Sequence, residues 1–338
     1  MKKLISLICV LAMVLALAAC GSSAPAAATE APAASTEAPA EDVSADKTFV
    51  VGICQLVQHP ALDAATQGFK DALTEALGDK VTFQEQNASG DSATCSLICN
   101  QFVSDEVDLI MANATASIQA AASATNTIPI LGTSITDYGV ALGVDNWTGV
   151  SGTNISGTSD LAPLDGQAAM IQELFPDANT IGLLYCSGEP NSIFQADSME
   201  ALLTDMGYSV ERYTFADSND VSSVTANACS NADVLYIPTD NTAASCTEAI
   251  NNVALSAGIP IVAGEEGIAA GCGAATLSIS YYDLGRATGE MAAEILTEGA
   301  DISTMEVRFA PAFTKEYNAD ICEALNITVP EDYVAIAK

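Results

Sequence analysis

The chain has 338 residues, and its 43 Asp and Glu against 10 Lys and Arg give a formal net charge of −33. So acidic a surface repels phosphate backbones and anionic lipid head groups, which excludes nucleic-acid binding. The length is enough for one large domain or for two lobes. No cofactor motif or metal-ligand pattern stands out, so we expect neither a cofactor nor a metal.

The first twenty residues have the pattern of a secretion signal. Lys2 and Lys3 precede an apolar run that is too short, and too rich in small residues at its end, to be a membrane span of about 20 residues. The run ends in LAACG, which resembles the lipobox of bacterial lipoproteins. This resemblance implies that residues 1–19 are a cleaved signal peptide and that Cys20 is lipidated, which anchors the chain on the extracytoplasmic face of a cell membrane. An ordinary signal peptide that ends near a cysteine is the alternative.

Residues 20–47 are mostly Ala, Pro, Ser, Thr and Glu. Such a segment has almost nothing to bury and cannot offset the entropy of becoming ordered. We expect a disordered tether that holds the following domain away from the membrane.

The rest of the first half alternates short β-branched runs with longer amphipathic ones. The strands are predicted at 48–54, 81–86, 107–111 and 127–131, and the helices at 60–77, 92–104 and 115–125. The first of these helices has Pro60 at its start, where a proline is favoured.

The same alternation recurs further along the chain. Strands are predicted at 180–185, 209–214, 233–237 and 259–263, and helices at 164–175, 192–206, 221–229 and 242–257. A strand at 275–280, a helix at 282–296 and an extended piece at 306–309 follow. Alternating strands and helices predict an α/β fold with parallel sheets covered by helices on both faces.

The two halves also resemble each other, because VDLIMANAT…TIPIL in the first matches ADVLYIPTD…GIPIV in the second. The sequence therefore predicts two Rossmann-like lobes with a ligand cleft between them. We expect the N-terminal lobe at 48–160 and 277–309, and the C-terminal lobe at 161–276 and 310–338. The hinges are expected near 156–163, 277–281 and 309–313.

Polar side chains follow the predicted strands, and ligands bind beyond the carboxyl ends of parallel strands. The candidate ligand-binding residues are Gln55, Asn87, Thr115, Thr133, Ser134, Tyr185, Glu189, Asn191, Thr239, Asp240, Asn241, Glu265 and Tyr281. For Thr115 and Asp240, helix capping is an equally good interpretation.

The charges at these strand ends favour a particular ligand. None of the loops holds a Lys or Arg, whereas Glu189, Asp240, Glu265 and Glu266 suit an ammonium group. An anionic group can still be held by backbone amides at a helix N-terminus such as 114–116. A small carboxylate and an amine together describe an amino acid, with Tyr185, Tyr281 and Leu56 as walls for its apolar part.

Several stretches resemble the ABC-transporter substrate-binding family that includes tryptophan- and tyrosine-binding lipoproteins. They are VGICQLVQHPALDAATQGFKDAL, QNASGD, QFVSDEVDLIMANAT, GLLYCSGEPNS, YIPTDNT and ISYYDLGRATGEMA. The resemblance spans roughly 48–310 and implies a type I periplasmic-binding fold, whose lobes are joined by three crossovers and close on the ligand. It also implies delivery of an amino-acid-like ligand, aromatic by that family's example, to a membrane permease with a separate ATPase.

The sequence argues against an enzyme. His59 is the only histidine, and no nucleophile elbow, phosphate-binding loop or zinc-protease motif accompanies it. We interpret His59 as a helix-entry residue. Eight cysteines remain after Cys9 and Cys20, and we interpret them as small buried thiols. The resembling family has Ala or Asn where this chain has Cys54, Cys95, Cys99 and Cys186.

Three alternatives remain open at this stage. A ligand sensor of the same fold, coupled to a signalling receptor, would use the same cleft and the same closure. Within transport, a nucleoside or a branched-chain amino acid could replace the aromatic amino acid as ligand.

Overall fold

The computed structural model describes residues 47–337. The predicted signal peptide, Cys20 and the tether up to residue 46 lie outside the described residues and stay predictions. Within the described range, no helix combines the length and the apolar character that a membrane crossing requires.

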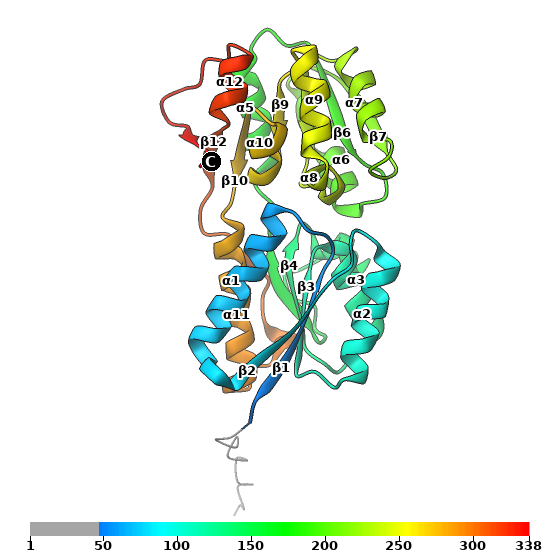
Figure 1. The fold of residues 1–338 in the computed structure, drawn as a ribbon, viewed down its shortest axis with the longest axis vertical. Coiled ribbons are helices and arrows are strands. Elements are labelled where there is room, and N and C mark those ends of the chain that lie inside the picture. The colour runs from blue at the N-terminus through cyan, green and yellow to red at the C-terminus, as the bar shows by residue number, and fades with distance from the viewer. Residues whose placement is uncertain (1–46, 338) are drawn as a thin grey trace, which may run out of the picture. The chain divides into compact units, whose positions relative to one another are not determined.

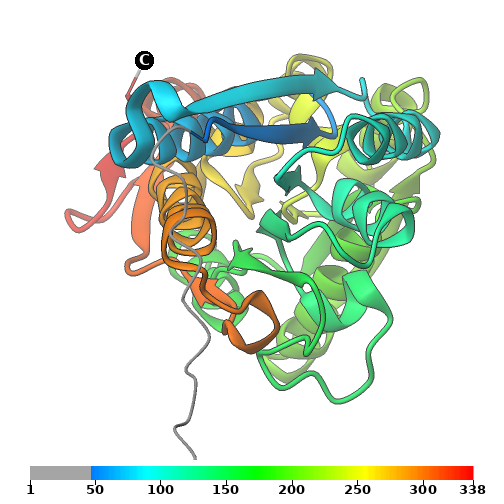
Figure 2. The ribbon, with the colours of Figure 1, turned by 90° about the horizontal axis from the view of Figure 1, so that it is seen from below.

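The first sheet is entirely parallel and has the strand order β11-β5-β4-β3-β1-β2 (Figure 1). Its strands are β1 (Phe49–Gln55), β2 (Val81–Asn87), β3 (Leu109–Asn113), β4 (Ile130–Ile135), β5 (Ile155–Ser159) and β11 (Arg308–Phe309). The helices beside it are α1 (Pro60–Leu77), α2 (Ser92–Ser104), α3 (Thr115–Ala124), α4 (Tyr138–Leu142) and α11 (Tyr281–Glu298). Helices α1 and α11 cover one face of the sheet, and α2 and α3 cover the other (Figure 2).

The second sheet has the order β13-β12-β10-β9-β8-β6-β7, and only the β10–β12 pair is antiparallel. Its strands are β6 (Thr180–Cys186), β7 (Ser209–Phe215), β8 (Val234–Ile237), β9 (Ile261–Ala263), β10 (Ala275–Ser278), β12 (Thr314–Tyr317) and β13 (Val334–Ala335). Its helices are α5 (Leu164–Leu174), α6 (Pro190–Asp205), α7 (Val221–Cys229), α8 (Asn241–Ser245), α9 (Thr247–Ala257), α10 (Glu266–Cys272) and α12 (Ala319–Ala324). The predicted α/β fold with two parallel-dominated sheets is confirmed.

The chain passes from one sheet to the other three times, after β5, after β10 and after β11. The connecting segments are 160–163, 279–280 and 310–313. The expected hinge at 156–163 is therefore too long, because its first four residues belong to β5, a strand that pairs with β4. The expected strand at 275–280 likewise ends at Ser278, and Tyr281 opens a helix instead of ending the strand.

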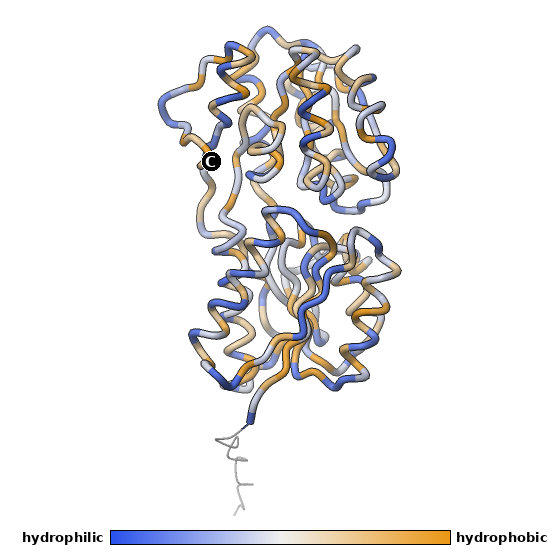
Figure 3. The backbone as a smooth tube through the Cα atoms, in the orientation of Figure 1, coloured by the Kyte–Doolittle hydropathy of each residue, from blue (hydrophilic) through white to orange (hydrophobic). Residues whose placement is uncertain are grey.

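Hydrophobic burial follows the pattern expected for strands covered on both faces. All five residues of β3, Leu-Ile-Met-Ala-Asn, are buried. The helices, in contrast, carry both hydrophobic and hydrophilic residues along their length (Figure 3). At roughly 1.5–3 kcal/mol for each large apolar side chain removed from water, these strands supply much of the hydrophobic stabilisation.

Helices α1 and α11 touch backbone to backbone where each carries a glycine. A Cβ atom on Gly68 would lie 2.0 Å from the Tyr282 carbonyl oxygen, and one on Gly285 would lie 2.0 Å from the Ala65 carbonyl oxygen. The close contact holds α11, which follows a crossing from the other sheet, firmly against the first lobe.

The cysteines of the described part of the chain are unpaired thiols. Six of them are buried in packed elements, which confirms the interpretation as small buried thiols, and Cys229 and Cys246 are half-buried. Cys54 and Cys95 both approach the hydroxyl of Ser117, at 3.7 and 3.6 Å.

Candidate functional site

A cavity with an empty volume of about 280 Å³ lies where the carboxyl ends of strands from the two sheets face each other. Its lining residues are His59, Leu62, Ser134, Thr136, Asp160, Asn191, Thr239, Asp240, Asn241, Ala244, Glu265 and Tyr281. Three carboxyl groups and no Lys or Arg occur among these described lining residues.

Three of the lining residues carry a buried polar atom without a hydrogen-bond partner among the described residues. These atoms are His59 Nδ1, Ser134 Oγ and Asp160 Oδ1. Buried polar groups in native proteins are nearly always paired, because an orphaned group costs about 1–3 kcal/mol. Three orphaned atoms around one cavity point to a ligand that pairs with them.

Asp160 follows β5 and is 4% exposed. Its Oδ2 accepts a 2.9 Å hydrogen bond from the Tyr281 hydroxyl, so that only Oδ1 is left free. Burial raises the pKa of Asp160, because the charged carboxylate loses its hydration. A ligand cation at Oδ1 would stabilise the charged carboxylate and so offset the free-energy cost of its lost hydration.

Glu265 differs from what the sequence suggests, because both of its oxygens cap helix α10. They accept hydrogen bonds from the backbone amides of Gly267 at 2.6 Å and Ile268 at 2.5 Å. Burial nevertheless raises the pKa of Glu265 to about 7. The expectation of a free carboxylate for an ammonium group is therefore wrong at this position, although the side chain lines the cavity.

Asp240 is also occupied, and for it the capping interpretation is confirmed. Its oxygens accept from the amide of Ala243 at 2.8 Å, which caps α8, and from the amide of Cys186 at 2.6 Å. Burial, and then the nearby Glu189 carboxylate, raises the pKa of Asp240 to about 8.

Glu189 binds the start of α8 rather than the cavity. Its two oxygens accept hydrogen bonds from the amides of Asn241 and Thr242, from the Asn241 side chain and from the Thr242 hydroxyl. Because both of its oxygens accept hydrogen bonds in this way, Glu189 fixes the position of Asn241.

A second, more open cavity with an empty volume of about 820 Å³ is also lined by Asn241. Leu56 and Glu189 line this second cavity rather than the first. The expected role of Leu56 as a wall of the same site as Tyr281 is therefore corrected.

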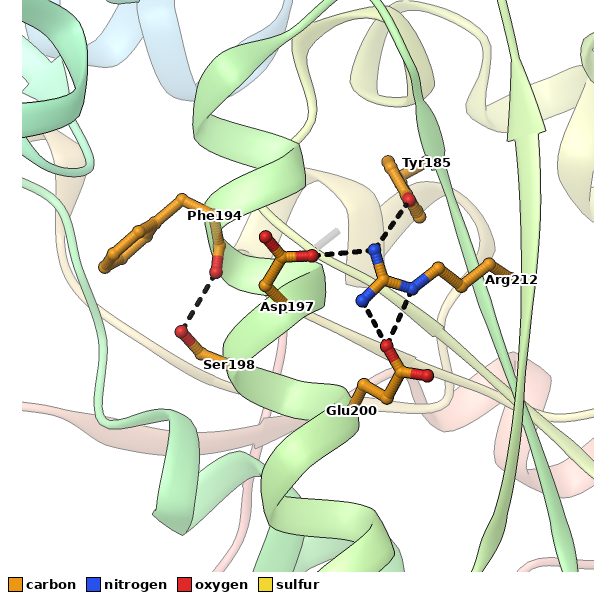
Figure 4. A network of polar contacts seen from close by, with 6 residues as sticks. All are labelled: Tyr185, Phe194, Asp197, Ser198, Glu200 and Arg212. Carbon is orange, nitrogen blue, oxygen red and sulfur yellow. Dashed lines mark hydrogen bonds and ion pairs between the residues drawn. The ribbon is translucent and has the colours of Figure 1, made fainter. Parts of the chain in front are cut away.

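Among the described residues, Tyr185 is not part of the lining of the first or the second cavity. Its hydroxyl accepts a 3.4 Å hydrogen bond from Arg212, whose guanidinium also binds Asp197 and Glu200 of α6 (Figure 4). In the same view Ser198 donates to the carbonyl of Phe194 within the helix. The expectation that Tyr185 walls the ligand is wrong, because the alternation along β6 turns this side chain toward the α6 side of the sheet.

The remaining predicted residues divide between the cavity and its supports. Asn191, Thr239 and Tyr281 line the cavity, together with Ser134. Support roles belong to Gln55, which bonds Asp63 and Thr66, and to Thr133, which bonds Thr158. Thr115 is the first residue of α3, but the N-cap is Ala114 and no side chain caps this helix, so the capping interpretation is wrong for Thr115. Asn87 is exposed at the end of β2 and caps a turn through Ser89.

Sequence reasoning missed Asp160 and undervalued His59. Asp160 follows a strand of small and polar residues that hydropathy does not reveal, so the sequence pattern gives no strand end at this position. His59 does precede α1, as expected, but it is only 6% exposed and also lines the cavity. Burial lowers the pKa of His59, which keeps the imidazole neutral near pH 7.

The chain is similar in sequence to a family of known proteins and to an individual known protein. The model of the ABC transporter substrate binding protein family matches residues 50–338. The tyrosine-binding protein of Clostridioides difficile (strain R20291) is 37% identical over 280 residues, which cover 82% of this chain and 81% of that protein.

Two solved structures are also similar. An ABC domain from Streptococcus pneumonia in complex with L-Trp is 31% identical, with a TM-score of 0.80, and the match covers 84% of this chain and 97% of that one. The ligand-free, open structure of a substrate binding protein with adhesive properties from Clostridium difficile is 37% identical, with a TM-score of 0.66, and covers 86% and 100%. The chain belongs to the family of ABC transporter substrate binding proteins.

Proposed function

We propose that this chain is the extracytoplasmic solute-binding lipoprotein of an ABC importer and that it binds an aromatic amino acid in the cavity between its lobes. The ligand would then be delivered to a membrane permease that is powered by a separate ATPase. Catalysis plays no part in this function.

The orphaned polar atoms around the cavity are the observation that carries the proposal. A ligand ammonium group fits Asp160 Oδ1, because a charge-assisted hydrogen bond to a carboxylate is stronger than one between neutral groups. The hydroxyl of Ser134 can donate to the ligand carboxylate. The names of the relatives, a tyrosine-binding protein and a complex with L-Trp, support the same class of ligand.

The conformation supports a mechanism of closure around the ligand. The chain matches the L-Trp complex with a TM-score of 0.80 and the open structure with 0.66, although the open protein has the higher sequence identity. Hydrogen bonds also join the lobes, from Gln195 to Thr136 at 3.4 Å and between the hydroxyls of Thr136 and Thr239 at 3.4 Å. Ligand stabilises the closed form because only that form lets both lobes contact it.

The lobes proposed for this movement are 48–160 with 277–309 and 161–276 with 310–338. The three passages of the chain between the sheets support this division except at 277–278, which belong to β10 of the second sheet, so the second boundary is moved to 279–280. The proposed contact residues are the cavity-lining Ser134, Asn191, Thr239 and Tyr281, to which we add Asp160 and His59.

The anchoring of the receptor depends on the lipid proposed at Cys20. A tethered receptor stays near its permease, so that the two meet at a high effective concentration. A sensor coupled to a signalling receptor would use the same anchor and cavity, and nucleosides or branched-chain amino acids are the alternative ligands.

Isothermal titration calorimetry of the mature chain with tyrosine, tryptophan, leucine and adenosine tests the proposal. We expect binding of the two aromatic amino acids and much weaker binding of leucine and adenosine. A thermal-shift assay gives a second readout, because ligand at a hundredfold excess over Kd stabilises the folded state by about 2.7 kcal/mol. Binding of adenosine without binding of any amino acid would overturn the proposed ligand class.

A further inference from the structure

The histidine of the first lobe meets an asparagine of the second lobe at the edge of the cavity. His59 Nε2 lies 3.3 Å from Asn241 Oδ1, and both residues line the cavity. An imidazole and a side-chain amide can each donate or accept a hydrogen bond, so the distance alone does not show which group donates. The surroundings of Asn241 decide that question.

The orientation of the Asn241 side chain is fixed by Glu189. The Asn241 amide nitrogen Nδ2 donates a 2.7 Å hydrogen bond to Glu189 Oε2, and the backbone amide of Asn241 donates to the same oxygen at 3.0 Å. If the side-chain amide were flipped, its oxygen would face a carboxylate oxygen, and both groups only accept. The amide oxygen Oδ1 must therefore face His59.

The position of the imidazole proton follows from this orientation. An amide oxygen accepts, so His59 Nε2 must carry the hydrogen that it donates to Asn241. In a neutral imidazole with its proton on Nε2, Nδ1 has a bare lone pair and can only accept. His59 Nδ1 is the buried atom that has no partner among the described residues.

We infer that His59 determines ligand specificity by accepting a hydrogen bond from an O–H or N–H group on the side chain of the ligand. This inference rests on the proposed function. Asn241 and Glu189 are positioning residues that hold His59 in the accepting tautomer. Tyrosine and tryptophan carry such a donor on the ring, whereas phenylalanine does not.

The ammonium group of the ligand is the competing donor for His59 Nδ1. Asp160 Oδ1 is a better acceptor for it, because a carboxylate pairs with the positive charge and a neutral imidazole does not. That leaves His59 for the neutral ring donor. Phenylalanine would then leave Nδ1 buried and unpaired, and a site built for a hydroxyl rejects such an analogue.

The affinities of tyrosine and phenylalanine, measured by calorimetry, give the first test. For the wild type we expect tyrosine to bind about 10-fold or more tightly than phenylalanine. In His59→Phe the ratio should fall to near one, mainly because tyrosine binding weakens. Asp145→Asn, an exposed carboxylate away from the cavity, is the control that should keep the wild-type ratio.

Three outcomes of the titration are distinguishable. If the wild type binds no amino acid, the proposed function itself fails. If both amino acids bind and His59→Phe weakens them equally, His59 contacts the common ammonium or carboxylate and the inference is overturned. If the variant leaves both affinities unchanged, His59 does not contact the ligand and the inference is also overturned.

Nitrogen NMR of the imidazole tests the tautomer directly, because the chain has one histidine and its signals need no assignment. With ¹⁵N-histidine in a protein that carries no histidine tag, we expect Nε2 protonated and Nδ1 unprotonated in the complexes with both amino acids. The Nδ1 resonance should shift between the phenylalanine and tyrosine complexes as the ring hydroxyl binds. In Glu189→Gln, Asn241 is freed and the Nδ1-protonated tautomer should become populated. A wild-type complex with Nδ1 protonated, or identical Nδ1 resonances in the two complexes, would overturn the inference.

Discussion

The hydroxyl of Tyr281 donates a 2.9 Å hydrogen bond to Oδ2 of Asp160 and leaves Oδ1 of the same carboxyl group unpaired. Tyr281 is the first residue of α11, directly after the second passage of the chain between the sheets, and Asp160 lies at the first passage. The contact thus joins two of the connecting segments at the cavity. It orients a carboxyl group that forms no ion pair with a Lys or Arg of the described chain.

Replacing Asp160 by Asn should weaken binding of the amino acid by roughly 10- to 100-fold, because a hydrogen bond to a charged group contributes about 1.5–3 kcal/mol. Calorimetry measures the change. The Asp145→Asn control should bind like the wild type, and circular dichroism should show that both variants are folded. Wild-type affinity in Asp160→Asn would exclude the proposed ammonium contact.

The raised pKa values of the cavity predict how stability depends on pH. Glu265, with a pKa of about 7, and Asp240, with a pKa of about 8, bind protons in the folded chain that they release in the unfolded chain. Their stabilising contribution is complete below the ordinary carboxyl pKa and is lost as the pH rises through about 7 to 8. We therefore expect the unfolding temperature of the ligand-free chain to fall between about pH 5 and pH 8.

The variant Glu265→Gln separates this effect from the general repulsion of a very acidic chain, which also grows with pH. Gln cannot titrate and keeps one oxygen acceptor for the α10 amides, so the slope of unfolding temperature against pH should become shallower. An unchanged slope in the variant would show that Glu265 does not hold a proton in the folded chain.

Replacing Gly285 by Ala should destabilise the fold. The new Cβ would lie 2.0 Å from the Ala65 carbonyl oxygen, and backbone atoms must move to make room. We expect the free energy of unfolding to fall by about 1–3 kcal/mol or more, measured by chemical denaturation. Gly188→Ala is the matched control, because its Cβ would meet the nearest heavy atom at an ordinary 3.7 Å. Equal stability of the two variants would contradict the close packing of α1 on α11.

Much of the fold could be predicted because it depends on local patterns. The run Leu109–Asn113 is apolar and short, which is typical of a strand buried on both faces, and Pro60 marks the start of α1. The repeated alternation of such runs with amphipathic helices indicates two parallel sheets. These signals do not depend on which distant residues come together.

Strand β5 could not be predicted, because its residues Ile-Ser-Gly-Thr-Ser are mostly polar and yet all buried. They tolerate burial since their hydroxyls pair with distant groups, as Thr158 does with Thr133 at 3.3 Å and with Thr288 at 2.9 Å. Hydropathy does not reveal such pairing. Asp160, the residue that follows β5, was missed for this reason.

The expectation that ligands bind beyond the carboxyl ends of parallel strands indicated the region of the cavity, but not the role of each side chain. Glu265 and Asp240 line the cavity, yet helix amides occupy their oxygens. Tyr185 was assigned to the wrong side of its sheet. Whether a strand-end carboxylate caps a helix or faces a ligand depends on the local path of the backbone, which periodicity does not describe.

The variant Cys20→Ala tests the proposed anchor. Without the acylated thiol, we expect the protein to be recovered from the culture medium, while its affinity for the amino acid is unchanged. Fractionation of the cells followed by calorimetry on the released protein measures both. A variant that remains in the membrane fraction would contradict the proposed lipidation.

A crystal structure of the chain with bound tyrosine tests the central claim most directly. The account predicts that the ligand fills the cavity between the lobes, with its ammonium nitrogen within hydrogen-bond distance of Asp160 Oδ1 and its phenol oxygen within that distance of His59 Nδ1. Tyrosine bound outside this cavity, or bound in it with the ammonium group away from Asp160, would contradict the account.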